Sequence, residues 1–418
     1  MSSPTLQLED PIARPPAPPP TFRGGFALFN YGFRPFFFAA GLFAVVSVAM
    51  WLGLYLGDVD LDLSLLPARW HAHEMLFGYT LAAVAGFFLT VVPNWTRAAA
   101  QKGPVLMLLA ALWVLGRVVM WGQGLWSDAL PYGVVVLGDM AFVVALAGVV
   151  ARPLLDPQHR RQLVFVPILL CLIAANLLFH FEGLGIEVLG VDWVQRGVML
   201  GLNAIIVLIA VMGGRVTPSF TSSFIGHGDP NVKVRQSPVL DRFVMAATWA
   251  LLVVDLVWPE RWLGGLVAFT AAGLHLARLA GWQSLRTLGN PILWVLHLGY
   301  VWLVLGLMLK GTADFGLLDQ VDALHALTIG AIGTMTLAIM TRASLGHTGR
   351  TVKARPVIVV AYGLVSMAAL LRLAVLAWPD MAEPLVIASG VAWILAFAAF
   401  VAVYAPILTR PRVDGRPG

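Results

Sequence analysis

The sequence predicts an all-α integral membrane protein with twelve transmembrane helices. Of its 418 residues, 59% are hydrophobic and only 12% are charged, whereas roughly 25% are charged in a soluble domain. The mean hydropathy is +0.83. Apolar stretches of about 20 residues, the length that crosses a bilayer core of about 30 Å, recur along the whole chain.

Short segments with Gly, Pro or charged residues separate the apolar stretches, and they mark where each predicted helix begins and ends. We place the helices at Phe36–Gly57, His71–Asn94, Pro104–Trp121, Pro131–Arg152, Leu163–Glu182, Gln195–Gly213, Leu240–Trp258, Trp262–Gly281, Pro291–Lys310, Val321–Arg342, Pro356–Trp378 and Pro384–Leu408. The stretches are too long and too uniformly apolar for the strands of a membrane barrel, and backbone in lipid must satisfy its own hydrogen bonds. Helices are therefore predicted throughout.

These helices form one predicted transmembrane domain, residues 31–410, between two short tails. Residues 1–30 contain the Pro-rich stretch ARPPAPPP and no apolar core of a signal peptide, which predicts a disordered cytoplasmic tail. Residues 411–418 form the second tail. Cys171 is the only cysteine, which excludes a disulfide within the chain, and no C-x-x-C-H motif is present for covalent haem attachment.

The distribution of Lys and Arg predicts that both termini are cytoplasmic. Alternate connections carry most of them, whereas the other connections hold only Arg69, Arg196, Arg261 and Lys310, together with most of the acidic residues. The sequence pI of about 9.6 then follows from the positive-inside rule, so the composition does not call for nucleic-acid binding.

A weak internal repeat predicts three successive units of four helices. The first helix of each unit has proline near its start, at Pro35, Pro167 and Pro291. The second helices carry His73-x4-Gly78, Arg196-x4-Gly201 and His325-x4-Gly330, and the third helices carry Arg117, Asp255 and Arg372. The alternative is that Pro at a helix start and Gly in a membrane helix are ordinary features.

The predicted topology sorts the histidines into two layers. An outer layer contains His71, His73, His180 and His325, and an inner layer contains His275 and His297, with His347 just beyond the helix at Val321–Arg342. Imidazole is a ligand for haem iron and for copper, and polar residues inside a membrane mark function by default. The alternatives are interfacial anchoring for the outer histidines and interhelical hydrogen bonds for the inner ones.

Glu74 is the candidate catalytic residue, because a carboxylate beside these histidines could orient a ring or carry protons. In a regular helix His71, Glu74 and Gly78 share a face, while His73 points nearly the opposite way. Either the two histidines serve different partners, or the segment after Pro67 is not regular helix.

Two arginines are candidate cofactor-binding residues. Arg117 and Arg372 lie inside predicted helices near the outer boundary, where a guanidinium needs an anion such as a haem propionate, Asp139, Asp255 or Glu74. The alternative is that they extend to the lipid headgroups.

Several motifs resemble the NnrS family across nearly all of residues 29–418. They are NYGFRPFF, WHAHEMLFG, VPNWT, GGRVTPSFT, NPILWVLHLGYVW and LHALTIGAIGTMTLAIMTRASLGHTGR. The resemblance implies a twelve-helix protein of the bacterial inner membrane that binds haem and copper and helps the cell withstand nitric oxide, usually alongside denitrification. The histidines within these motifs are His71, His73, His297, His325 and His347, while His180 and His275 fall in less distinctive stretches.

From the resemblance we expect a b-type haem, held without covalent attachment, and copper. The outer layer would bind nitric oxide, Glu74 would supply protons, and the inner pair would hold a second haem or the copper. The partners would be nitric oxide, membrane lipid and an unknown electron donor. Two activities are compatible with this expectation. The protein could be an oxidoreductase similar to nitric oxide reductase, or it could bind nitric oxide stoichiometrically as a scavenger. The alternative function is a proton-coupled secondary transporter that exports a metal or a nitrosylated iron complex.

Overall fold

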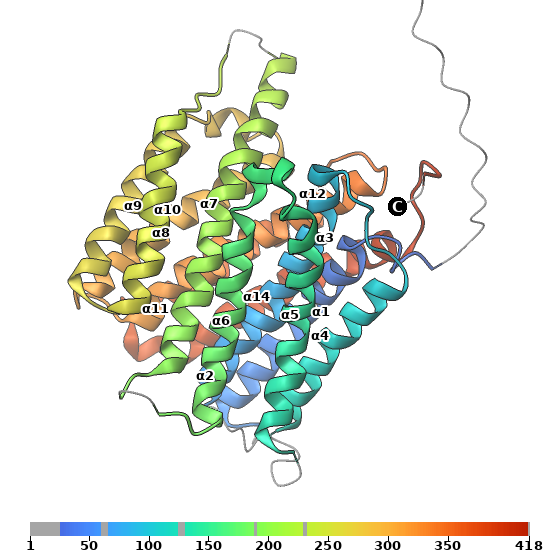
Figure 1. Ribbon diagram of the computed structural model, residues 1–418. Coiled ribbons are helices and arrows are strands. Elements are labelled where there is room, and N and C mark those ends of the chain that lie inside the picture. The colour runs from blue at the N-terminus through green and yellow to red at the C-terminus, as the bar shows by residue number, and fades with distance from the viewer. Residues whose placement is uncertain (1–25, 60–65, 124–129, 188–189, 229–231, 417–418) are drawn as a thin grey trace, which may run out of the picture.

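The protein is a bundle of helices that run side by side (Figure 1). The computed structural model describes residues 26–59, 66–123, 130–187, 190–228 and 232–416, and no strand occurs among them. Most of the tail predicted at residues 1–30 lies outside these ranges.

The helices follow one another with short connections. They are α1 (Phe33–Leu56), α2 (Pro67–His73), η1 (Glu74–Thr80), α3 (Leu81–Thr96), α4 (Pro104–Gly122), α5 (Tyr132–Leu154), η2 (Pro157–Gln162), α6 (Phe165–Gly183), α7 (Trp193–Gly228), α8 (Pro238–Val257), α9 (Trp262–Ala280), η3 (Ser284–Thr287), α10 (Pro291–Asp314), α11 (Gln320–His325), η4 (Ala326–Gly333), α12 (Thr334–His347), α13 (Pro356–Ala374), η5 (Pro379–Met381) and α14 (Ala382–Thr409). Segments α2, η1 and α3 form one continuous rod, as do α11, η4 and α12.

The prediction of a multi-pass, all-helical membrane protein is confirmed. Among the described residues, eleven helices are long and apolar enough to cross a membrane. Helix α8 corresponds to the predicted span Leu240–Trp258 but differs from the eleven. It is not among them because three charged residues, Asp241, Arg242 and Asp255, interrupt its apolar sequence.

Two predicted helix ends are too early. Helix α7 continues past the predicted end at Gly213 to Gly228, and α12 continues past Arg342 to His347. In α7, the glycines accommodate a neighbouring side chain and do not end the helix. A Cβ on Gly214 would lie 1.9 Å from Arg278 Nη2, and Arg278 Nη1 donates to the Ala210 carbonyl at 2.8 Å. His347 is therefore the last residue of α12 and does not lie beyond that helix.

Three rods form the centre of the bundle. In the most apolar 18 residues of each helix, the share of buried residues is 83% for the rod that contains η1, 89% for α7 and 72% for the rod that contains η4, against 33–44% for most of the others. The three rods contact one another, and the less buried helices surround them. Residues on these rods are therefore the farthest from lipid.

The outer helices close into a ring. Helix α5 packs on α6, α9 packs on α10, and the last helix, α14, packs on the first, α1. The Ala27 amide donates to the Thr409 carbonyl at 2.8 Å, and the Arg34 guanidinium donates to the carbonyls of Leu408 and Arg410 at 2.9 and 2.8 Å. The start of α1 and the end of α14 thus lie at the same end of the bundle (Figure 1).

Two of the central rods are interrupted by π-helices, which are rare and frequently occur at functional sites. Segment η1 directly follows His73, and η4 directly follows His325. Regular α-helix was predicted at both places. Each π-helix contains the glycine of its His-x4-Gly motif, close to an aromatic ring of a neighbouring helix. A Cβ on Gly78 would lie 2.2 Å from Phe43 Cε1, and one on Gly330 would lie 2.6 Å from Trp302 Cδ2.

Candidate metal centre

Two of the predicted outer histidines meet around a carboxylate inside the bundle. The Oδ2 atom of Asp139, on α5, lies 3.1 Å from His73 Nε2 and 3.2 Å from His180 Nε2. Asn176, one turn before His180 on α6, places its Oδ1 3.0 Å from His73 Nε2. These side chains are at most 2% exposed. Three helices that are distant in sequence thus direct nitrogen and oxygen atoms to one point.

The other nitrogen of each ring also has a partner. His73 Nδ1 lies 2.9 Å from Glu74 Oε1, and His180 Nδ1 lies 3.1 Å from the Tyr132 hydroxyl. If both Nδ1 atoms carry the proton and donate it to these oxygens, both Nε2 atoms present a lone pair toward Asp139. Such hydrogen bonds orient the histidine ligands of metal ions in proteins.

Arg117 balances part of the charge of this group. Its guanidinium pairs with both Glu74 and Asp139, and the Trp121 indole donates to Glu74 Oε2 at 2.7 Å. Gly116 makes room for this pairing, since a Cβ there would lie 3.1 Å from Asp139 Oδ1. With neutral imidazoles, two carboxylates and one guanidinium leave a formal charge of −1. A buried group with uncompensated charge is costly, so this one favours a proton or a metal cation.

The geometry fits a small metal ion. The candidate ligand atoms of His73, Asp139 and His180 all lie within 4.8 Å of one another. Ligand atoms around a tetrahedral ion with bonds of about 2.0 Å are about 3.3 Å apart, close to the two distances from Asp139. Two imidazoles and one carboxylate form a donor set that binds divalent first-row metals. A haem does not fit here, because its ring would need the space that Asp139 and Asn176 occupy.

The other two outer histidines lie together elsewhere. The ring of His71 stacks on Trp51 of α1 with centroids 4.6 Å apart, and its Nδ1 is buried without a partner. His325 Nδ1 lies 2.7 Å from the Val321 carbonyl, an arrangement that leaves Nε2 as the lone-pair nitrogen. Arg372 lies near both rings, and His71 lies near His325. Arg372 itself pairs with Asp322 at 2.5 Å.

The inner histidines, His275 and His297, do not meet at a common carboxylate as His73 and His180 do. His275 lies between the hydroxyls of Thr248 and Tyr300, at 3.1 and 2.7 Å, and His297 lies between those of Thr221 and Ser284, both at 2.9 Å. Every ring nitrogen of this pair thus has a hydroxyl partner, the arrangement that the alternative of interhelical hydrogen bonding describes.

His347 lies apart from the inner pair, near the start of α1. Its ring packs against Tyr31 and Phe33, with ring centroids 6.0 and 5.6 Å away. The structure therefore brings His347 together with aromatic side chains and not with His275 or His297.

The local geometry differs from the face predicted for Glu74. Its carboxylate lies with His73 and not with His71, because the regular α-helix ends at His73 and Glu74 begins η1. Of the two alternatives for this segment, the first holds, because the two histidines have different neighbours. The second is wrong, because Pro67–His73 is regular α-helix and the irregular part begins at Glu74. Arg117 has the carboxylate partners named for it, Glu74 and Asp139.

Sequence reasoning missed Asp139, Asn176 and Tyr132 as members of the site. Asp139 was considered only as a partner for an arginine. The available signal was its position, since it is the only charged residue between Tyr132 and Ala151. Its pairing with His180 joins residues 41 positions apart, so no local motif contains both.

A family model described as NnrS protein matches residues 27–412 of the chain. These residues include every helix in the described part of the chain and each side chain of the candidate metal centre. No curated protein matches the chain.

Proposed function

Because this chain belongs to the NnrS family, we propose that it protects a bacterial cell against nitric oxide by binding the gas at metal centres inside the membrane. The convergence of His73, His180 and Asp139 carries the proposal. These residues form a buried, negatively charged group of metal-ligating atoms in a membrane protein of the nitric oxide response. Nitric oxide is small and uncharged, so it can reach a site within the bilayer through lipid.

The metal that we propose for this centre is copper. Imidazole is a good ligand for copper, and a monovalent copper ion would bring the formal charge of the group from −1 to zero. When bound, the ion would supply affinity for nitric oxide and exchange of an electron. Glu74 and Tyr132 would hold the two imidazole rings, and Arg117 would hold the Asp139 carboxylate.

The b-type haem fits the second outer pair better. His325 has one nitrogen fixed by a backbone carbonyl, and His71 has a buried nitrogen without a partner. Each ring thus has a nitrogen that can ligate iron. Arg372, beside both rings, is the group that would pair with a propionate.

Reduction of nitric oxide remains an extension of this proposal. Two molecules of nitric oxide with two electrons and two protons give nitrous oxide and water. Glu74, next to His73, is placed to hold one of those protons. The electrons require a donor that the chain alone does not identify.

The topology that we propose has twelve crossings and cytoplasmic termini in the bacterial inner membrane. The Ala27–Thr409 hydrogen bond supports an even number of crossings, because eleven would put the start of α1 and the end of α14 on opposite faces. Helix α8 would then be the twelfth, with its charged Asp255 paired inside the protein. The excess of Lys and Arg on the side of the termini supports their cytoplasmic location.

We also propose three units of four helices, α1–α5, α6–α9 and α10–α14. Their packing is cyclic, since the last helix of each unit contacts the first helix of the next. The second helices of the three units are the three central rods, and they contact one another. In the first and third units, a π-helix directly follows the histidine of the His-x4-Gly motif and contains its glycine. An aromatic ring from the first helix of the same unit lies against that glycine.

One buried ion pair outside the metal centre favours the alternative of transport. Lys310 is 1% exposed and pairs with Asp255 at 2.9 Å and Asp314 at 2.6 Å. Buried ionisable groups inside a membrane are typical of proton relays in transporters. Flux into proteoliposomes that depends on a proton gradient would favour that function over metal-centred binding of nitric oxide.

The test is the metal content of the purified protein and its absorption spectrum with and without nitric oxide. We expect copper in the wild type and its loss from His73→Ala, His180→Ala and Asp139→Asn, with haem bands kept. His71→Ala and His325→Ala should lose the haem bands and keep copper. The control is His159→Ala, because His159 lies in the α5–α6 connection and its ring bonds to the Pro153 carbonyl near the end of α5. Copper and nitric oxide reactivity that survive all three copper-site changes would reject the proposal.

A further inference from the structure

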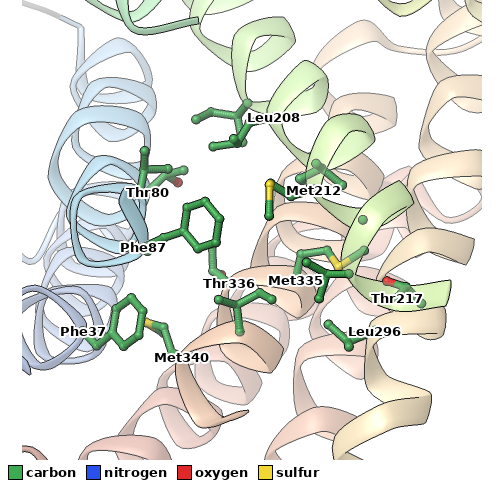
Figure 2. A pocket seen from close by; sticks show the side chains of 17 residues that line it. Phe37, Thr80, Phe87, Leu208, Met212, Thr217, Leu296, Met335, Thr336 and Met340 are labelled. Carbon is green, nitrogen blue, oxygen red and sulfur yellow. The ribbon is translucent and has the colours of Figure 1, made fainter. Parts of the chain in front are cut away.

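An apolar, partly open cavity of about 80 Å³ lies between the three central rods of the bundle. The three central rods line it, through η1 and α3, α7, and α12, and α1 and α10 each add a side chain, Phe37 and Leu296 (Figure 2). It is therefore a space between the proposed units and away from the candidate metal centre.

The cavity offers very little to a water molecule. Three threonines line it together with aliphatic, aromatic and methionine side chains. The Thr80 hydroxyl donates to the Met75 carbonyl at 2.8 Å, and the Thr336 hydroxyl donates to the Ile332 carbonyl at 2.7 Å. Thr217 is fully buried, and its hydroxyl has no partner. A buried water usually makes two to four hydrogen bonds. Because Thr80 and Thr336 already use their donors, only Thr217 has a donor to offer, and the rest of the lining is apolar.

The size and chemistry of the cavity fit a small apolar molecule. A cavity needs only about 10–15 Å³ to hold one water-sized molecule, so 80 Å³ is enough for a diatomic gas. The side chains of Met212, Met335 and Met340 are polarisable and adapt their shape to a guest. The unpaired Thr217 hydroxyl can donate one hydrogen bond to a weak acceptor.

We propose that this cavity binds an uncharged diatomic gas, and that the gas is nitric oxide. The choice of nitric oxide among such gases rests on the proposed function. One short segment connects the two sites, because Glu74 of the candidate metal centre is the first residue of η1 and Thr80 of the cavity is its last. The cavity would hold gas beside the rod that carries His73, one of the three candidate metal ligands.

The experiment uses xenon as a probe of the metal-loaded protein in detergent. Xenon is apolar and enters dry cavities, and its NMR shift reports binding in solution. We expect one saturable xenon site in the wild type. Ala83→Phe and Val84→Phe, which add a ring to the cavity wall, should abolish it, and Val118→Phe, on the exposed face of α4, should leave it unchanged. Thr217→Val should keep xenon binding, because it removes only the hydroxyl.

Nitric oxide is then added under anaerobic conditions. Displacement of bound xenon by nitric oxide in the His73→Ala variant, which would lack copper, supports the proposal, since the metal centre cannot cause it. The proposal is overturned if the wild type binds no xenon, if both phenylalanine variants bind it unchanged, or if nitric oxide does not displace it. Copper content is measured on the same samples, so failure of the copper proposal is recognised separately.

Discussion

At the scale of single residues, Arg117 connects the charges of the candidate metal centre. It is the only guanidinium that pairs with Glu74 and Asp139 among the described residues, and both carboxylates are almost fully buried. A buried ion pair adds little net stability compared with an apolar replacement, but removal of one partner leaves an uncompensated charge. The arginine is therefore required by the carboxylates that the site needs for its chemistry.

We expect Arg117→Gln to destabilise the metal-free protein by about 3–5 kcal/mol, the typical cost of leaving a buried charge unpaired. The measurement is thermal unfolding in detergent. Arg160→Gln, at an exposed position in the α5–α6 connection, is the matched control and should have little effect. Adding Glu74→Gln to Arg117→Gln should restore part of the loss. A double variant less stable than both single variants would contradict this account.

At the scale of helices, the apolar stretches predicted the rods because lipid requires length and internal hydrogen bonds, and both are visible in a sequence. The π-helices were not predictable in this way. They depend on contacts such as the one between Gly78 and Phe43, residues on different helices. The same reason applies to the site. The residues His73 and Glu74 stand in one motif, but Asp139 and His180 join them only when α5 and α6 pack beside η1.

Gly78 tests whether the close packing of η1 supports the metal centre. A Cβ there would meet Phe43 Cε1 at 2.2 Å and Arg117 Nη1 at 3.0 Å. We expect Gly78→Ala to cost about 1–3 kcal/mol through overpacking and to weaken copper binding, because Arg117 must move. Gly133→Ala, where a Cβ meets nothing within 4 Å, should change neither stability nor copper content. Unfolding temperature and copper content of the two variants decide the matter, and equal behaviour would count against a supporting role for η1.

At the scale of the whole molecule, the two ends of the described chain meet. The Ala27–Thr409 hydrogen bond and the packing of α14 on α1 close the ring of helices. If the bundle is built from three units of four helices, each unit begins and ends on the same face of the membrane. The folded structure should then depend on the packing between the units more than on the order in which they follow one another along the chain.

Circular permutation tests this arrangement, because exposed connections tolerate new termini. We join the native ends with a short Gly/Ser linker and open the chain between Arg160 and Arg161, both exposed. The new chain begins with α6, which enters the membrane from the same side as α1 in the proposed topology. We therefore expect it to insert and to match the native chain in helical content and in copper content.

The matched control has the same linker but is opened between Glu260 and Arg261, in the connection between α8 and α9. With α8 as a crossing, this connection lies on the face opposite the termini, so the chain would have to begin outside and its first helix would enter against the charge bias that sets orientation. We expect this permutant to fail to insert or to lose copper. If α8 were not a crossing, this connection would lie on the same face as the start of α1, as the α5–α6 connection does, and the two permutants would behave alike. The difference between them therefore measures whether α8 is the crossing that makes the number even.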